Sequence, residues 1–418
     1  MRQINLREYQ RCNEPVLLSR EERDALAEAI PSVTVEPASG HESHYFLTPS
    51  STIGVVEIGD LAIQILPKLP IDRVLFLISY AIDPKDWQNI GFDLEEQSSI
   101  VEAVIPAFTM HVRQALRRGI LQGYQVREDA LATVRGQIRF GDQIRDRYGI
   151  VPPVDVRFDE FTEDIVENRL IKAATGLLLR KSIRSHQLRT ELRAIESALQ
   201  NVSHQHFAGN QLPEVQFTRL NERYRSAIEL AKLILRLSSF DIQHGNTRAS
   251  SFLVDMNQVF EDFVVLALRE ALGLTKHSFP QNADGRRVRL DEAERVVLKP
   301  DISWWQGRRC CFVGDVKYKK TNAVGIKHAD LYQLLAYTVA TDLPNGLLIY
   351  AAGEDEPRTH EVKFAGKTLT VMALDLAGAP ADVLMQIKRV AMQIRNGARV
   401  MHNKQVSCPC DPEEGALC

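Results

Sequence analysis

The stretch Lys299–Lys320 reads KPDISWWQGRRCCFVGDVKYKK, and its pattern decides how the C-terminal part of the chain folds. Two segments that read as strands flank the turn-forming triplet QGR at 306–308, which predicts an antiparallel hairpin. Side chains alternate between the two faces of a strand, so Asp315 and Lys317 should lie on the same face. A turn at this place would also bring Asp301 back beside Asp315.

Two carboxylates at one point repel each other unless a cation joins them or one is protonated. Mg²⁺ suits such a place, because it takes oxygen ligands and is often held by one or two carboxylates plus phosphate. Lys317 could then orient a water molecule or stabilise charge that develops on a phosphate oxygen. The alternative is a solvated hairpin with outward charges. The apolar residues before Asp315 favour a buried strand, in which an unpaired carboxylate is costly.

Composition limits the possible class of protein. The chain has 418 residues, 44% of them hydrophobic, so it can form two or three domains with real cores. Its formal net charge of −3 means that any nucleic-acid surface must be local. We expect a cytoplasmic protein, because its six cysteines form no disulfide framework, no secretory signal opens the chain and no apolar run is long enough to span a membrane.

The pattern along the chain predicts a multidomain protein of the α+β or α/β class. Residues 1–95 are rich in strand signals, including an alternating hairpin around Gly59 and Asp60. Residues 96–245 are mostly helical, and the polar segment 243–250 marks a boundary. Residues 246–400 begin with a helix over 251–272 and go on as an α/β domain with a central mixed sheet. The tail, 401–418, is expected to be disordered.

A second acidic run, FDEFTEDIVENR at 158–169, could suggest another metal site. Its spacing is helical, and Thr162 could cap a helix whose first turn carries the acids. We therefore interpret this run as structural or as an interface to a partner.

The motifs Pro300-Asp301 and Asp315-Val316-Lys317, with 13 residues between the two aspartates, resemble the PD-(D/E)xK nuclease superfamily. Such nucleases have a restriction-endonuclease-like fold. The superfamily often adds a glutamate from the helix before the sheet, and Glu261 matches it, with the neighbouring Asp262 as the rival. It also often carries a glutamine and a tyrosine on the following helix. Gln333 and Tyr337 fit, being four residues apart and thus on one helical face.

The order of motifs from about residue 45 to 375 resembles McrC-like proteins, the nuclease subunits of McrBC-type restriction systems that depend on 5-methylcytosine. This resemblance implies Mg²⁺-dependent cleavage of DNA, with Asp301, Asp315 and Glu261 as metal ligands and Lys317 and Gln333 as further catalytic residues. It also implies a separate AAA+ GTPase, McrB, that recognises the methylated DNA and binds the GTP, and that is stimulated by the N-terminal part of the McrC-like subunit. The chain agrees, because its nearest match to a P-loop, FAGKTLT, has Glu361 where a glycine is required.

The basic residues around the hairpin predict a track for DNA phosphates, which would position DNA without reading its sequence. The alternative is an ordinary basic surface. Two other functions stay open: a nuclease-inactive activator of an NTPase ring, and a stand-alone DNA nuclease in restriction or repair. The predicted DNA contacts are Lys299, Lys319, Lys320 and Tyr337.

Overall fold

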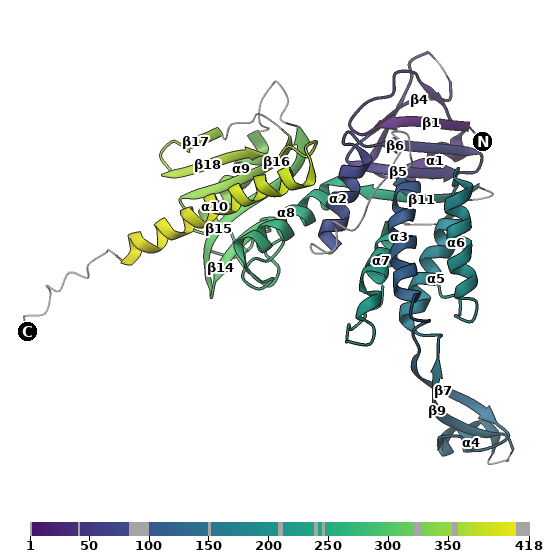
Figure 1. Cartoon of the computed structure of the whole chain (residues 1–418). Coiled ribbons are helices and arrows are strands. Elements are labelled where there is room, and N and C mark those ends of the chain that lie inside the picture. The colour runs from purple at the N-terminus through teal and green to yellow at the C-terminus, as the bar shows by residue number, and fades with distance from the viewer. Residues whose placement is uncertain are drawn as a thin grey trace, which may run out of the picture.

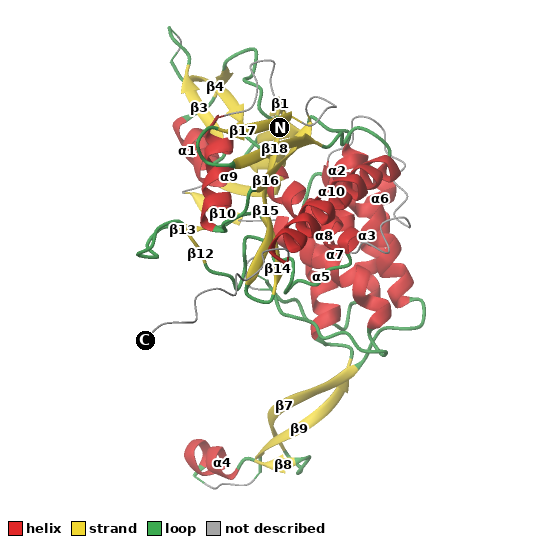
Figure 2. Ribbon diagram, turned by 90° about the vertical axis from the view of Figure 1, so that its left-hand side faces the viewer, coloured by secondary structure: helices red, strands yellow, loops and turns green. Residues whose placement is uncertain are grey.

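The computed structural model describes residues 2–40, 42–82, 100–148, 152–207, 212–237, 241–244, 247–320, 328–352 and 358–406. Figure 1 shows a sheet at the N-terminal end with a group of helices below it, and a second sheet with its own helices on the other side. A long β-strand arm projects from the helices, as Figure 2 also shows from the side. No helix in these ranges is both long and apolar enough to cross a membrane.

The amino-terminal sheet has the strand order β1-β6-β5-β11-β10. The predicted hairpin around Gly59 is confirmed, since β5 and β6 pair antiparallel with Ile58 opposite Leu61. β1 lies parallel to β6, and a small sheet, β2-β4-β3, lies beside this one. The elements of this part are β1 (Arg2–Arg7), β2 (Val16–Leu17), α1 (Arg20–Ala29), β3 (Val33–Pro37), β4 (His44–Pro49), β5 (Thr52–Ile58), β6 (Leu61–Leu66), α2 (Ile71–Ile82), β10 (Asp241–His244) and β11 (Thr247–Asp255).

The predicted helix over 251–272 is wrong in its first turn, because residues 251–255 belong to β11. Phe252 and Val254 alternate into the core, and β11 pairs antiparallel with β5, so the strand period prevails there. The helix begins at Met256, and the Asp255 side chain accepts hydrogen bonds from the Asn257 backbone N–H and the Ser51 hydroxyl. β11, which follows the predicted boundary, thus completes the amino-terminal sheet.

The middle of the chain is helical apart from the arm. The long apolar period over residues 167–200 forms two helices, because Ser185 caps a new helix by accepting from the Leu188 N–H. The elements are α3 (Ile100–Leu116), α5 (Val166–Leu179), α6 (His186–Ala198), the short 3-10 helix η2 (Glu222–Tyr224) and α7 (Arg225–Leu237), with β7 (Gly123–Leu131), β8 (Gln137–Ile138), α4 (Phe140–Arg147) and β9 (Val154–Thr162) in the arm.

The acidic run at 158–169 is helical only in its second part. Val154, Val156 and Phe158 form a small buried cluster at a spacing of two, so the run starts as the strand β9. Thr162 ends this strand and does not cap a helix, as α5 begins at Val166. The predicted cap is therefore wrong.

The carboxy-terminal part holds a mixed five-stranded sheet in the order β14-β15-β16-β18-β17, as predicted. β15, β16 and β18 are parallel, whereas β14 and β17 pair antiparallel with their neighbours. α10 continues past the predicted start of the tail at 401, and residues 407–418 lie outside the described ranges. The elements are α8 (Met256–Leu272), β12 (Val288–Arg289), β13 (Val297–Leu298), β14 (Ile302–Gln306), β15 (Arg309–Lys320), α9 (His328–Ala340), β16 (Asn345–Ala352), β17 (Arg358–Val362), β18 (Lys367–Ala373) and α10 (Pro380–Val406).

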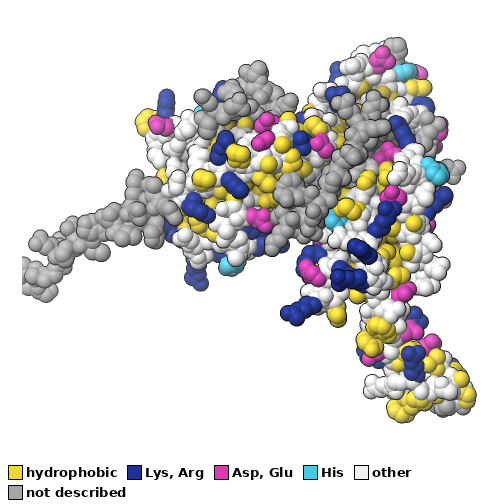
Figure 3. Space-filling view, in the orientation of Figure 1, with side chains coloured by type: hydrophobic (Ala, Val, Ile, Leu, Met, Phe, Trp, Pro, Cys, Tyr) yellow, Lys and Arg dark blue, Asp and Glu magenta, His cyan; other side chains and the backbone are white. Residues whose placement is uncertain are grey.

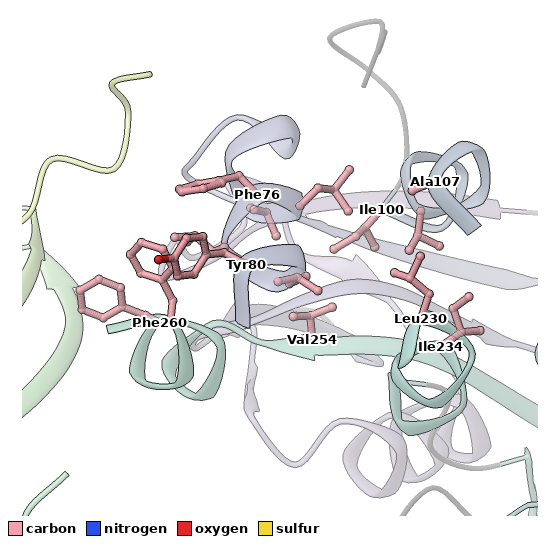
Figure 4. Close-up of a cluster of buried hydrophobic side chains, with 14 of the residues drawn as sticks. Phe76, Tyr80, Ile100, Ala107, Leu230, Ile234, Val254 and Phe260 are labelled. Atoms are coloured by element: carbon pink, nitrogen blue, oxygen red, sulfur yellow. The ribbon is translucent and has the colours of Figure 1, made fainter. Parts of the chain in front are cut away.

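One apolar core joins the two sheets through α8. Figure 4 shows Phe76 and Tyr80 of α2 close to Phe260 of α8, with α3 and α7 side chains in the same cluster. The rings of Phe76 and Tyr80 both meet that of Phe263 edge to face. This packing fixes α8, and with it one side of the second sheet, against the amino-terminal part.

Candidate active site

The hairpin brings Asp301, Asp315 and Lys317 together, as the sequence pattern predicts. β14 and β15 are joined by a two-residue turn at Gly307, whose φ of 62° suits glycine, and Ile302 lies opposite Gly314. Asp301, just before β14, accepts a 2.8 Å hydrogen bond from the Val316 N–H. Lys317 Nζ lies 2.5 Å from Asp315 Oδ2 and 3.6 Å from Asp301 Oδ2.

The alternation along β15 places these charges on one face. Val313 lies in the core beneath α9, whereas Val316 and Tyr318 lie in the core shared with α8. Asp315 and Lys317 thus point to the α9 side of the sheet, as the period of two requires.

Asp315 is a buried carboxylate with too little positive charge around it. Its exposed fraction is 0%, and Lys317 Nζ, 2.5 Å from Oδ2, is the cation that its carboxylate contacts. Burial and the nearby Asp301 charge raise the pKa of Asp315 to about 8, against the opposing effect of Lys317. Burial alone would lower the pKa of Lys317, but the two carboxylates together raise it. One ammonium therefore serves two carboxylates.

Glu261 of α8 is held beside the hairpin by two side-chain amides that the sequence patterns do not reveal. Its Oε1 accepts hydrogen bonds of 2.8 Å from Gln281 Nε2 and 2.8 Å from Asn282 Nδ2. The Asn282 N–H donates to the Asp301 carbonyl over 3.1 Å, which ties the amide pair to the hairpin. Burial raises the pKa of Glu261, the Gln281 amide opposes this, and the Asp301 charge adds to it. The rival Asp262 also accepts from Gln281, over 2.6 Å.

Gln333 and Tyr337 share one face of α9, as predicted. Gln333 Nε2 donates to the Tyr337 hydroxyl over 2.6 Å, and that hydroxyl donates to the Lys299 carbonyl over 3.2 Å. Tyr337 is 2% exposed, and its contact with DNA stays a prediction. The ring packs in the core beneath α9, and the hydroxyl holds the backbone at Lys299, two residues before Asp301.

The predicted phosphate contacts lie around this site. Lys299 is exposed beside it. Lys319 and Lys320 continue β15, but their side chains lie outside the described residues. Sequence reasoning missed Asp330 of α9, which accepts a 2.7 Å hydrogen bond from Tyr350 and whose charge helps to raise the pKa of Lys317. No fixed spacing links Asp330 to the hairpin, so no sequence signal identifies it.

A model of the family described as McrBC 5-methylcytosine restriction system component matches residues 47–351. The chain belongs to this family. The family resemblance seen in the sequence is thereby confirmed.

Two solved structures match this McrBC family member at low identity, and the first of them shares its fold. One is a refined half-complex from a tetradecameric assembly of Thermococcus gammatolerans McrB AAA+ hexamers with bound McrC, at a TM-score of 0.59 and 20% identity, covering 94% of this chain and 100% of that chain. Another is the cryo-EM structure of the Thermococcus gammatolerans McrBC complex, at a TM-score of 0.41 and 21% identity, covering 65% of this chain and 88% of that chain. A search of curated proteins found no match.

The donor set of this McrBC component fits Mg²⁺ at two carboxylates. Asp301 and Asp315 would supply oxygen ligands, and the buried Asp315 Oδ1 has no hydrogen-bond partner. Within the described ranges, no three His, Cys, Asp or Glu side chains group as a metal centre, so the three-carboxylate set that includes Glu261 is not formed. The amides of Gln281 and Asn282 engage Glu261 instead. Two carboxylates suffice for Mg²⁺ that also binds water and phosphate.

Proposed function

We propose that this McrBC component is the nuclease subunit of its restriction system and hydrolyses DNA phosphodiester bonds with Mg²⁺ bound by Asp301 and Asp315. The observation that carries this proposal is a pair of buried carboxylates, Asp301 and Asp315, that share the ammonium of Lys317 at 3.6 and 2.5 Å. Two buried carboxylates that share one ammonium are costly to a folded protein, and a bound cation would supply the missing positive charge. When bound, Mg²⁺ would polarise the phosphate and lower the pKa of a coordinated water.

The other residues position the chain or the charge. Lys317 orients the water or stabilises the negative charge that develops on the phosphate oxygens. Glu261 assists from α8, where the amides of Gln281 and Asn282 orient its carboxylate. Gln333 supports the Tyr337 hydroxyl and so the backbone before Asp301. Lys299, Lys319 and Lys320 hold DNA phosphates, which fixes the DNA without reading its sequence.

We further propose that the chain works with a McrB-like AAA+ GTPase, which binds the GTP and recognises most of the methylated DNA. The similar fold in an assembly of McrB hexamers with bound McrC supports this partner. The arm offers a contact surface, because Tyr124 and Phe161 are 76% and 56% exposed with ring centroids 5.0 Å apart. Figure 3 shows hydrophobic side chains gathered on this arm. The N-terminal region, 1–95, is the other proposed contact.

The test is a reconstitution of the full chain with a McrB-like GTPase, GTP, Mg²⁺ and methylated DNA. Wild type is compared with Asp315→Asn, and GTP turnover and DNA cleavage are read in the same reactions. We expect Asp315→Asn to keep the stimulation of GTP turnover and to lose cleavage. A wild type that stimulates the GTPase but cuts no DNA would instead indicate an inactive activator, and cleavage without the GTPase would indicate a stand-alone nuclease.

A further inference from the structure

A buried polar contact links the proposed catalytic strand to the first strand of the chain. Tyr318 directly follows Lys317 on β15 and points to the opposite face of the sheet. Its hydroxyl donates a 3.0 Å hydrogen bond to Oε1 of Glu8, the residue after β1. Tyr318 and Glu8 are 1% and 2% exposed. These two residues lie 310 positions apart in the sequence.

Two further residues of the amino-terminal part complete this contact. The Lys68 N–H donates to Glu8 Oε1 over 2.7 Å, and Lys68 Nζ lies 3.7 Å from the centre of the Tyr318 ring. The Tyr9 hydroxyl donates to the Tyr318 carbonyl over 3.4 Å. The side chain and the backbone of Tyr318 are therefore both held from the amino-terminal sheet. We call the group Glu8, Tyr9, Lys68 and Tyr318 the joint.

The joint also touches α8 next to the proposed site. The ring of Tyr318 lies 5.9 Å, centroid to centroid, from the ring of Phe260, which directly precedes Glu261. Tyr318 is thus a chain neighbour of Lys317 and a packing neighbour of the residue before Glu261. A shift of Tyr318 would move both proposed site residues relative to Asp301.

We propose that Glu8 and Tyr318 are positioning residues for DNA cleavage, and that they hold the Lys317 end of β15 in register with the amino-terminal sheet. This inference rests on the proposed nuclease function. A hydrogen bond to a carboxylate is stronger than a neutral one, and burial strengthens it further. The joint therefore provides a rigid path from the region that contacts the GTPase to the lysine that acts on the phosphate. Reacting groups must be placed within about 1 Å. A looser joint therefore lowers the rate of DNA cleavage, although the joint itself does not contact the substrate.

The test uses Tyr318→Phe in the full chain, reconstituted with the GTPase, GTP, Mg²⁺ and methylated DNA. The quantity measured is the number of DNA cuts per GTP hydrolysed. We expect this ratio to fall by roughly tenfold or more, with GTP turnover unchanged. The matched control is Tyr80→Phe, which removes a similar hydrogen bond of 3.1 Å to Glu270 between α2 and α8, away from β15. We expect this control to keep the wild-type ratio.

Variants of Glu8 separate positioning from a general loss of structure. Glu8→Gln keeps an oxygen that can accept from Tyr318 and from the Lys68 N–H, so it should retain most of the ratio. Glu8→Ala should behave like Tyr318→Phe. Thermal unfolding of each variant reports how much protein is folded.

Three results would overturn the inference. The joint has no positioning role if Tyr318→Phe cuts as often per GTP as wild type does. The same conclusion follows if Tyr80→Phe lowers the ratio equally, or if cuts and GTP turnover fall together with the folded fraction. A wild type that cuts no DNA overturns the proposed nuclease function as well, whereas a cutting wild type with an unchanged Tyr318→Phe ratio overturns the joint alone.

Discussion

Asp164 and Asp315 are both buried aspartates in charged stretches of the sequence, yet their surroundings differ in kind. The Asp164 carboxylate accepts from Nε and Nη2 of Arg169, at 2.8 Å each, and from the N–H and hydroxyl of Ser203, at 2.8 and 2.9 Å. These bonds, Arg169 first among them, hold the pKa of Asp164 below its ordinary value. Asp315 instead contacts the ammonium of Lys317, which it shares with Asp301, and has a raised pKa.

The difference separates a structural carboxylate from a candidate functional one. A fully paired carboxylate such as Asp164 stabilises the loop and helix around it. A buried carboxylate whose charge is only partly balanced lowers stability, and it persists where a ligand or reaction needs it. Acidic residues in a sequence therefore identify a metal site only when their partners are known.

The largest expected effect is on cleavage by Asp315→Asn. Changes to residues that only support a metal ligand lower activity by up to about 100-fold. Loss of a ligand itself should therefore lower the DNA cleavage rate by more than that. The matched variant Asp164→Asn should cut at nearly the wild-type rate per folded molecule, which gel assays of linear DNA products can measure. Equal losses in both variants would remove the functional distinction between the two aspartates.

The next effect is on folding stability, where Asp164→Asn should be the more damaging of the two substitutions. Asp164→Asn weakens charge-assisted hydrogen bonds to Arg169 and Ser203, so we expect its free energy of unfolding in urea to fall by about 2–3 kcal/mol. Asp315→Asn removes a repelling charge and should leave the free energy of unfolding unchanged or higher. If Asp315→Asn proves the less stable of the two, then Asp315 is the structural carboxylate.

A smaller effect concerns Mg²⁺. Binding to the folded state should stabilise wild type and Asp164→Asn by about 1.4 kcal/mol when Mg²⁺ is at ten times its Kd. Asp315→Asn should show no such rise in the midpoint of thermal unfolding. Magnesium-free, chelator-treated samples supply the baseline, and an equal rise in all three proteins would mean that Mg²⁺ binds elsewhere.

The smallest effect is on the pH dependence of stability without metal. The folded pKa of Asp315 lies above the ordinary value, so the folded state binds more protons and stability falls as pH rises from about 4 towards 8. The folded pKa of Asp164 lies below the ordinary value for an aspartate. Asp164 therefore stabilises the fold above about pH 4, and this stabilisation is lost as the pH falls further. We therefore expect Asp315→Asn to gain stability relative to wild type as the pH rises from 5 to 7 in urea titrations. A constant difference over this range would contradict the raised pKa.

The grouping of Asp301, Asp315 and Lys317 could be predicted from the sequence because it depends on local rules. A period of two fixes the face of each β15 residue, and the turn at Gly307 starts the hairpin. The register then shifts by one residue between Trp304 and Trp305, a detail that the sequence pattern did not predict. The pair of Gln333 and Tyr337 follows from helical spacing in the same way.

Other features depend on tertiary packing, which spacing does not encode. The amides of Gln281 and Asn282 reach Glu261 across a loop whose path has no periodicity. The hydrogen bond between Glu8 and Tyr318 in the joint connects residues that lie 310 positions apart in the sequence. The segment 251–255 is a short apolar run that fits a strand or a helix, and only pairing with β5 decides between them.

β11 ends at Asp255 and α8 begins at Met256, with no residue between them. A fragment that starts at residue 246 would carry this strand without its partner β5 and expose Phe252 and Val254 on an open edge, which promotes aggregation. A fragment that stops at 245 would uncover β5 in turn. Recombination between relatives would therefore preserve both halves only if the crossover moves β11 together with the sheet that it completes.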